Sequence, residues 1–272
     1  MLKIRNYLDF STINVLNCVK GQQLIIMLIL GLGDTMRKAR NEIKYLCTEQ
    51  ELSILESRIK NVCHADAHAR EDGSYTVRSL YFDDYWNSCY FDNENGTDMR
   101  EKYRIRIYDG NMQKFFLECK RKVSDISYKT SCPLPITLCN SILDENRYWK
   151  LQNYSSDSMN EQERMLLRKF YLSYRTRLLV PKIIVEYERT PYINEHGNVR
   201  ITFDRYIGFS NKISDFKEQS IFKRPILSCG KHILEIKFDE YLPDYIHGLF
   251  EDMNLQRTAF SKYYYCRKFS CE

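Results

Sequence analysis

The sequence predicts an α+β fold in which an antiparallel β-barrel is covered by helices on its outside. Many short segments alternate apolar and charged residues, which is the two-residue period of a β-strand. Few of these segments are separated by helical patterns, so the βαβ units that build parallel sheets are rare. Almost every predicted strand also has one charged face and one apolar face, which is typical of an antiparallel sheet or barrel.

The alternating segments place strands along most of the chain. The predicted strands span residues 40–47, 75–82, 100–108, 114–122, 182–192, 199–204 and 232–238, with a further short strand at Tyr90 and Phe91. Asp109 with Gly110, and His196 with Gly197, are turn signals between neighbouring strands.

Helical spacing appears between and after these strands. Thr48 and Glu51 form a predicted capping box, and Leu52, Leu55 and Ile59 follow at helical spacing. Further helices are predicted over residues 133–143, 160–171, 242–250 and 260–269, and a polar loop over residues 64–73.

Composition indicates a globular protein whose cysteines are reduced. The chain has 272 residues, of which 43% are hydrophobic and 28% charged, and its net charge of +5 is too small to predict a nucleic-acid partner. Its 10 cysteines form no CxxC pair and show no zinc-ligand spacing. We therefore expect free thiols and a cytoplasmic location.

The N-terminal segment differs from the rest of the chain. Residues 24–32 (LIIMLILGL) are apolar, but a membrane-spanning helix needs about 20 such residues. Dense patterning begins only at Arg40. We expect residues 1–35 to be an extension and residues 36–272 to form one domain without a membrane segment of its own. Any membrane partner would be a separate protein.

The strand at residues 100–108 carries an unusual row of charge. Arg100, Lys102, Arg104 and Arg106 occupy every second position, so they share one face at spacings of about 7 Å. For a single strand, a face in water is the simpler interpretation. However, helices outside the sheet need the apolar strand faces to pack on, which turns the charged faces inward.

Inward-facing cations would line a polar tunnel and would need neutralisation there. Some would pair with Glu42, Glu118 and Glu235. The remaining excess predicts a multivalent anion such as a phosphate chain, on which the few carboxylates would help to hold a divalent cation.

The order and spacing of several short motifs resemble the VTC (vacuolar transporter chaperone) domain family. This family comprises the polyphosphate polymerases of the CYTH, or triphosphate tunnel metalloenzyme, superfamily. The matching segments are EIKY (42–45), VRSLYFDD (77–84), KYRIRIYDG (102–110), LECK (117–120), YKTSCPL (128–134), EYERTPY (186–192), VRITFD (199–204), LEIKF (234–238) and FSKY (260–263).

The resemblance implies a tunnel that binds ATP and inorganic polyphosphate and moves the terminal phosphoryl group of ATP onto the polymer with a divalent metal, Mn or Mg. It also places a C-terminal helix carrying Lys262 at the tunnel. The implied catalytic residues are Arg104, Arg106, Lys120, Glu235 and Lys262; the implied phosphate-binding residues are Lys44, Arg100, Lys102, Lys129, Tyr187, Arg189 and Arg200; and the implied metal ligands are Glu235 and Glu42.

One departure concerns the metal. The superfamily's first strand reads ExExK, whereas Arg40 stands here where the first glutamate would be. The loss of that carboxylate reduces metal capacity, suits a longer anion and leaves catalysis largely to Glu235.

Two other functions remain open: a tunnel triphosphatase that hydrolyses tripolyphosphate or nucleoside triphosphates, and a non-catalytic polyphosphate-binding module. Outside the tunnel, we interpret His64, Asp66 and His68 as a structural loop rather than a metal cluster. Asp83 with Asp84 is interpreted as a turn cap.

Overall fold

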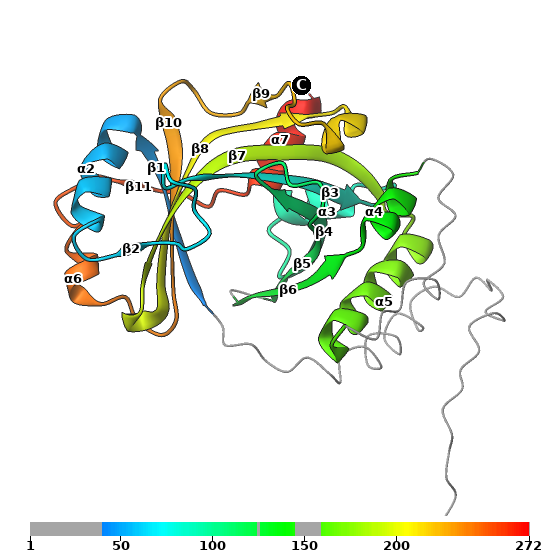
Figure 1. Cartoon of the computed structure of the whole chain (residues 1–272), viewed down its shortest axis with the longest axis horizontal. Helices are drawn as coiled ribbons and strands as arrows, with labels where there is room; N and C mark the ends of the chain where they lie inside the picture. Colours follow the sequence, from blue (N-terminus) through cyan, green and yellow to red (C-terminus); the bar gives the residue numbers. More distant parts are fainter. Residues whose placement is uncertain (1–39, 124–125, 145–158, 272) are drawn as a thin grey trace, which may run out of the picture. The chain divides into compact units, whose positions relative to one another are not determined.

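The structure is a computed structural model that describes residues 40–123, 126–144 and 159–271 (Figure 1). The predicted extension at residues 1–35, with its apolar stretch, lies outside the described residues. That boundary therefore stays a prediction.

A single antiparallel sheet forms the centre of the fold. Its strands follow the order β11 (Gln256–Arg257), β1 (Asn41–Thr48), β10 (Lys231–Phe238), β8 (Val199–Ser210), β7 (Val180–Asn194), β3 (Tyr75–Asp83), β4 (Met99–Tyr108), β5 (Phe115–Val123) and β6 (Ile126–Leu134). Two short strands, β2 (His64–Ala65) and β9 (Arg224–Pro225), pair with β7 and β8.

The sheet curls into the predicted tunnel without closing its hydrogen-bond ladder. Within the described residues the ladder ends at β11 and at β6. The curl nevertheless brings the two ends toward each other, because Lys120 on β5 forms an ion pair with Glu42 on β1, with 3.1 Å between Nζ and Oε2. The α+β tunnel fold is thus confirmed, with side chains instead of backbone bonds joining its ends.

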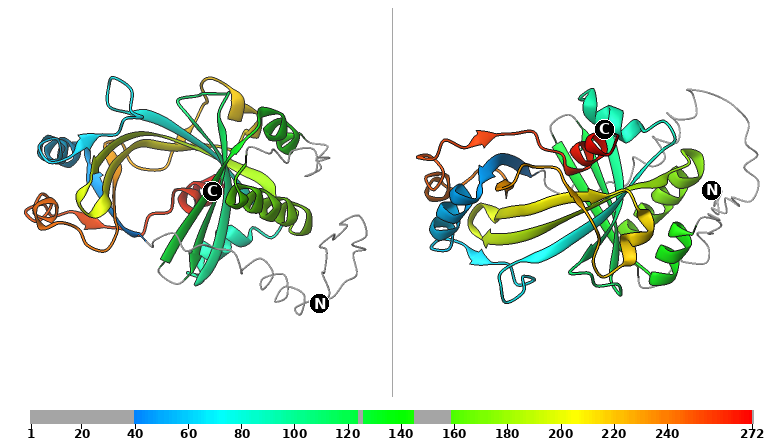
Figure 2. Two further views of the ribbon diagram at one scale, coloured as in Figure 1. Left: turned by 60° about the horizontal axis from the view of Figure 1, so that its bottom comes forward. Right: turned by 90° about the horizontal axis from the view of Figure 1, so that it is seen from above.

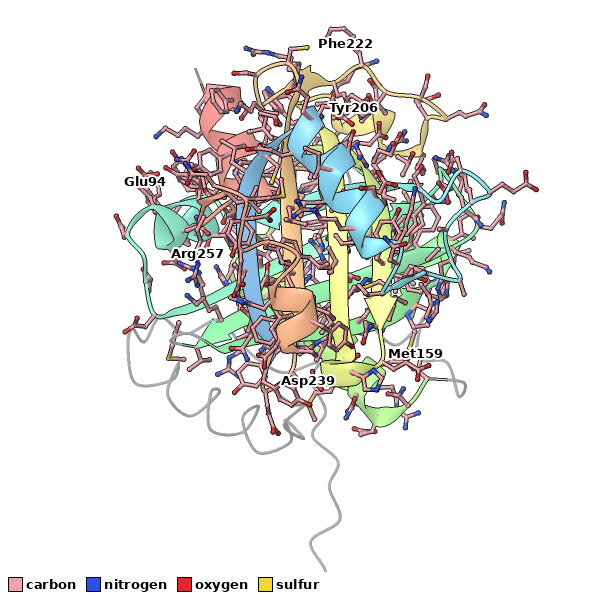
Figure 3. The ribbon with its side chains drawn as sticks, turned by 90° about the vertical axis from the view of Figure 1, so that its left-hand side faces the viewer. Glu94, Met159, Tyr206, Phe222, Asp239 and Arg257 are labelled. Carbon is pink, nitrogen blue, oxygen red and sulfur yellow. The ribbon has the colours of Figure 1, made fainter. Side chains whose placement is uncertain are left out.

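Helices cover the outer, apolar faces of the strands. Helix α2 (Glu49–Ile59) begins with the predicted capping box and, with α6 (Asp244–His247), lies across β1, β10 and β8 (Figure 3). Helices α4 (Ile136–Leu143) and α5 (Glu161–Thr176) pack in the same way over β3 to β6 (Figure 1). The apolar faces point outward, as predicted, and the charged faces are left to the interior.

Helix α7 (Lys262–Cys271) covers the apolar part of the inner face. Its Tyr263 and Cys266 are buried in one cluster with Val77 and Val185, which lie on that face of β3 and β7. It also packs beside α3 (Ser88–Glu94) (Figure 2). The rings of Tyr90 and Tyr264 stack there, with 5.5 Å between their centroids. A C-terminal helix at the tunnel is therefore present.

Asp83, at the end of β3, holds both of these helices. Its carboxylate accepts hydrogen bonds from the backbone N–H of Cys89 at 2.9 Å and of Tyr90 at 3.1 Å, which lie in the first turn of α3. The Tyr263 hydroxyl donates to the same carboxylate at 2.5 Å. The interpretation of Asp83 as a cap is confirmed.

Three sequence predictions need correction. Tyr90 and Phe91 belong to helix α3 instead of a strand, because Asp83 satisfies the first N–H groups of that helix. Residues 133–134 end strand β6, since Leu134 precedes Pro135 and a residue before proline disfavours helical angles. The helix predicted at 242–250 is only the single turn α6.

Two expectations about the chain's chemistry can be compared with the structure. Each cysteine in the described ranges is a free thiol. No helix in these ranges is long and apolar enough to cross a membrane. The cytoplasmic location stays a prediction.

We expect Tyr263→Phe to destabilise the fold by about 1.5–3 kcal/mol, because it removes the hydroxyl that donates to the buried Asp83 carboxylate. Urea denaturation followed by circular dichroism measures the change. Tyr264→Phe is the control, since its hydroxyl lies at the exposed surface, where it interacts with Glu94 and accepts a 3.5 Å hydrogen bond from Lys268. Equal midpoints for the two variants would show that Asp83 does not hold α7.

Candidate functional site

Strand register places the predicted cations on one face of the sheet. Residues opposite each other in a ladder share a face. Lys102 lies opposite Lys120, which lies opposite Lys129 on β6. Arg106 lies opposite Ser79, and Lys44 lies opposite Glu235. These side chains therefore all point into the lumen.

The first charge cluster surrounds Glu118 on β5, whose side chain is 3% exposed. Its Oε2 is 2.6 Å from Arg104 Nη2 and 3.5 Å from Arg106 Nη1, and its Oε1 is 2.6 Å from Lys129 Nζ. Burial alone would raise the pKa of this carboxyl, but Arg104, Arg106 and Lys129 hold it below its usual range. Glu118 is thus an ionised counterion for three predicted phosphate ligands.

Hydroxyl groups fix the two arginines of this cluster. Arg104 donates from Nη1 to the Tyr81 hydroxyl at 2.7 Å, and Arg106 donates from Nε to Ser79 Oγ at 3.1 Å. Arg106 Nη2 is also 3.5 Å from the hydroxyl of Tyr187. Nearby Arg189 and Arg106 lower the pKa of Tyr187 in spite of its burial.

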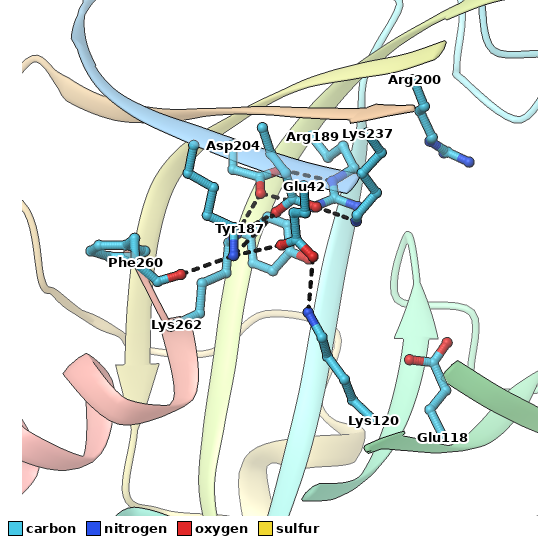
Figure 4. Close-up of polar contacts among 12 residues, drawn as sticks. Glu42, Glu118, Lys120, Tyr187, Arg189, Arg200, Asp204, Lys237, Phe260 and Lys262 are labelled. Atoms are coloured by element: carbon cyan, nitrogen blue, oxygen red, sulfur yellow. Dashed lines mark hydrogen bonds and ion pairs between the residues drawn. The ribbon is translucent and has the colours of Figure 1, made fainter. Parts of the chain in front are cut away.

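The second cluster surrounds Asp204 on β8 (Figure 4) and Glu235, which lies on the neighbouring strand β10. Arg189 donates to both Asp204 oxygens, at 2.7 and 2.8 Å, and Lys262 Nζ lies 2.5 Å from Oδ2. Glu235 forms an ion pair with Lys237 and lies 4.0 Å from the Lys262 ammonium. Burial opposes ionisation of both carboxyls, yet these cations hold both pKa values below the usual range.

Glu42 links this cluster to the opposite wall. Its Oε1 lies 2.6 Å from Lys44 Nζ, and its Oε2 contacts Lys120 across the lumen (Figure 4). Burial and the neighbouring Glu235 raise the pKa of Glu42, but Lys44, Lys120 and Lys237 outweigh them and lower it to about 2. Carboxylates thus neutralise the cations on β4 to β6, through Glu118, and those on β1, β7, β10 and α7, through Glu42, Asp204 and Glu235.

Three lysines of the lumen have lowered pKa values. Burial, with the nearby Arg100 charge, lowers the pKa of Lys102 to about 7. Desolvation of the ammonium groups between the strands, together with neighbouring cations such as Lys44 and Arg106, lowers the pKa values of Lys120 and Lys129 to about 8, against the attraction of Glu42 and Glu118. Since 43% and 49% of the Lys120 and Lys129 side chains are exposed, a ligand in the lumen can reach them.

Not every predicted ligand enters these clusters. Arg200 shares the inner face and lies opposite Lys237 in the β8–β10 ladder. Its guanidinium donates to Asp66 at 2.7 Å and to the Tyr75 hydroxyl at 3.0 Å instead of to the carboxylates of the two clusters (Figure 4). Lys102 donates to Asn93 at 2.6 Å. Arg100 precedes Lys102 by two residues, so it lies on the same face of β4, opposite Lys122 on β5.

Sequence reasoning missed the roles of Asp204, Lys237 and Asp66. The first two follow from the two-residue period, since Asp204 shares a face with Arg200, and Lys237 with Glu235. Asp66 comes from the predicted loop, and it accepts from Arg200 and lies 2.9 Å from His68 Nδ1. No sequence signal connects that loop to β8.

The carboxylates fit a divalent metal only together with phosphate oxygens. Within the described ranges, no three His, Cys, Asp or Glu side chains gather to form a metal site. Glu42 and Glu235 do face the same ammonium group, with Lys44 Nζ 2.6 and 3.9 Å from their oxygens. Mg²⁺ commonly takes one or two carboxylates and completes its shell with phosphate and water.

A solved structure with the same fold is found, together with weaker likenesses. A putative adenylyl cyclase from Hippeastrum, described as having a dominant triphosphatase activity, matches with a TM-score of 0.50 and 12% identity over 86% of this chain and 96% of its own. A putative adenylate cyclase from Vibrio parahaemolyticus matches with a TM-score of 0.44 and 10% identity over 85% of this chain and 99% of its own. The Mimivirus capping enzyme triphosphatase matches with a TM-score of 0.34 and 11% identity over 84% of this chain and 94% of its own.

The search of curated proteins found no match. A sequence model of the VTC domain matches residues 39–270, which include all but the last of the described residues. The motifs that resemble this family are also the segments whose side chains form the charged lumen. The chain therefore belongs to the VTC domain family.

Proposed function

We propose that this protein is a polyphosphate polymerase that transfers the terminal phosphoryl group of ATP to a growing inorganic polyphosphate chain. One observation carries the proposal. On the inner face the cations Lys44, Lys102, Arg104, Arg106, Lys120, Lys129, Arg189, Lys237 and Lys262 outnumber the carboxylates Glu42, Glu118, Asp204 and Glu235. Such a lumen attracts a multivalent anion.

The cations would bind phosphate by leaving their present counterions. Arg104 shares Glu118 with Arg106 and Lys129, so each has a competitor for the same carboxylate. A phosphate chain offers several charged oxygens to all of them at once. Lys44, Arg100, Lys102, Lys129, Tyr187, Arg189 and Arg200 would hold the chain.

Catalysis would then consist of positioning and charge stabilisation. Arg104, Arg106, Lys120 and Lys262 would stabilise charge on the transferred phosphoryl group and keep attacking and leaving oxygens in line. An ionised phosphate acceptor needs no general base. Glu235 and Glu42 would hold Mn²⁺ or Mg²⁺, which supplies further positive charge to the phosphate oxygens when it is bound.

A triphosphatase is the second candidate, favoured by the position of Glu42 and Glu235 around one ammonium group, where a metal could assist attack by water. A polyphosphate-binding module without activity is the third. ATP and polyphosphate are the proposed partners. The presence of a separate membrane partner and the absence of a nucleic-acid partner stay predictions.

The reaction products distinguish the three candidate functions. Incubation of the purified protein with ATP and Mn²⁺ should yield ADP and a polymer that is visible on a polyphosphate gel. Release of free phosphate without polymer would identify a triphosphatase instead. Binding of tripolyphosphate with neither product would identify a binding module.

Arg106→Met and Glu235→Gln should change affinity in opposite directions. Arg106→Met removes a cation, so tripolyphosphate binding should weaken by about 1.5–3 kcal/mol. Glu235→Gln removes the negative charge beside Lys237 and Lys44, so metal-free affinity should stay equal or rise while metal-dependent turnover is lost.

Calorimetry without metal measures both affinities, with the exposed Lys114→Met as a control for charge loss elsewhere. Strongly weakened binding in Glu235→Gln would instead make Glu235 the counterion that holds these cations in place.

Tripolyphosphate binding should be coupled to proton uptake near pH 8. Lys120 and Lys129 are partly deprotonated there, and a bound polyanion raises their pKa values. Affinity should therefore fall as pH rises through 8. Titration calorimetry in buffers of different ionisation enthalpy counts the protons; Lys129→Met should take up fewer than the wild type. An identical count in both proteins would contradict the assignment of Lys129.

A further inference from the structure

Thr202 on β8 is a polar group of the lumen that none of the predicted roles uses. Its residue is 2% exposed, and its hydroxyl has no hydrogen-bond partner among the described residues. A buried hydroxyl without a partner costs about 1–3 kcal/mol, so such groups are rare in the absence of a ligand to satisfy them.

Strand register places Thr202 on the same face as the site. Thr202 lies opposite Glu235 in the β8–β10 ladder and opposite Pro191 in the β8–β7 ladder. Since these opposed residues share a face, Thr202 stands on the inner face beside the second charge cluster. Its neighbour in β7 is Pro191, and proline has no backbone N–H.

The nearby carboxylates already accept from stronger donors. Asp204, two positions along β8 on the same face, accepts from Arg189 and Lys262. Glu235 forms ion pairs with Lys237 and with Lys44. Glu235 lies between Thr202 and Lys44 in the ladders. A phosphate chain that draws Lys44 and Lys262 from these carboxylates would therefore occupy the stretch of the inner face that carries Thr202.

We propose that Thr202 is a substrate-binding residue whose hydroxyl donates a hydrogen bond to a phosphate oxygen held by Lys44 and Lys262. This inference rests on the proposed binding of polyphosphate in the lumen. The Thr202 hydroxyl would be a neutral donor to phosphate beside Glu235. A lysine or arginine at this position would form an ion pair with Glu235 and would be less available to phosphate.

Thr202→Val and Thr202→Ser separate this role from a structural one. Valine keeps the branched shape that fits a strand and removes the hydroxyl, whereas serine keeps the hydroxyl. Thr202→Val should leave the ligand-free protein as stable as the wild type or more stable, because an unsatisfied buried group is gone. It should weaken metal-free tripolyphosphate binding by at least about tenfold, and Thr202→Ser by less than about threefold.

Thermal unfolding without ligand and calorimetry with sodium tripolyphosphate provide the two readouts. Unchanged affinity in Thr202→Val, or equal losses in both variants, would overturn the proposal. So would a loss that occurs only when Mn²⁺ is present, since the hydroxyl would then act through the metal site. If the wild type itself does not bind tripolyphosphate, the proposed function fails before Thr202 is tested.

Discussion

The neutralisation of arginine and lysine inside a curled sheet is the constraint on which the rest of this structure depends. Glu118 and Asp204 are almost fully buried, and each is ionised because cations surround it. Removal of one such carboxylate would leave buried charge without a counterion, which is strongly destabilising. The same carboxylates keep the cations together when no ligand is bound, so the site is formed before its anion arrives. The ion pair between Glu42 and Lys120 also joins the two ends of the sheet where the backbone ladder does not.

This constraint accounts for the arrangement of the helices. With charge inside, the apolar strand faces must be covered from outside, and α2, α4 and α5 do so. The exception is the apolar end of the inner face, where α7 packs through Tyr263 and Cys266. The same helix places Lys262 against Asp204, so one element both seals an apolar surface and supplies a cation to the site. Asp83 connects this helix to the sheet and to α3.

Much of the site could be predicted from the two-residue period alone. Arg104 and Arg106 share a face because successive side chains of a strand alternate, and the helices that cover the apolar faces turn this face inward. The ion-pair partners of these cations could not be predicted in this way. Glu118 pairs with Arg104, Arg106 and Lys129 because β5 lies between β4 and β6 in the sheet. Asp66 reaches Arg200 from a loop that no local pattern places near β8. Tyr90 and Phe91 resembled a strand because residue propensity does not include the hydrogen bonds from the Cys89 and Tyr90 N–H groups to Asp83, at the end of the preceding strand. Strand ends also shifted, since β8 continues to Ser210 through a bulged register with β7 that composition does not reveal.

The central claim is that polyphosphate replaces carboxylates as the counterion of the lumen cations. A crystal structure of the protein with bound tripolyphosphate tests it most directly. We expect the phosphates between the two walls, with the guanidinium of Arg104 and the ammonium groups of Lys129 and Lys262 within hydrogen-bond distance of phosphate oxygens and at least one of them moved away from Glu118 or Asp204. A tripolyphosphate bound only on the outer surface, with the ion pairs of Glu118 and Asp204 unchanged, would contradict the account.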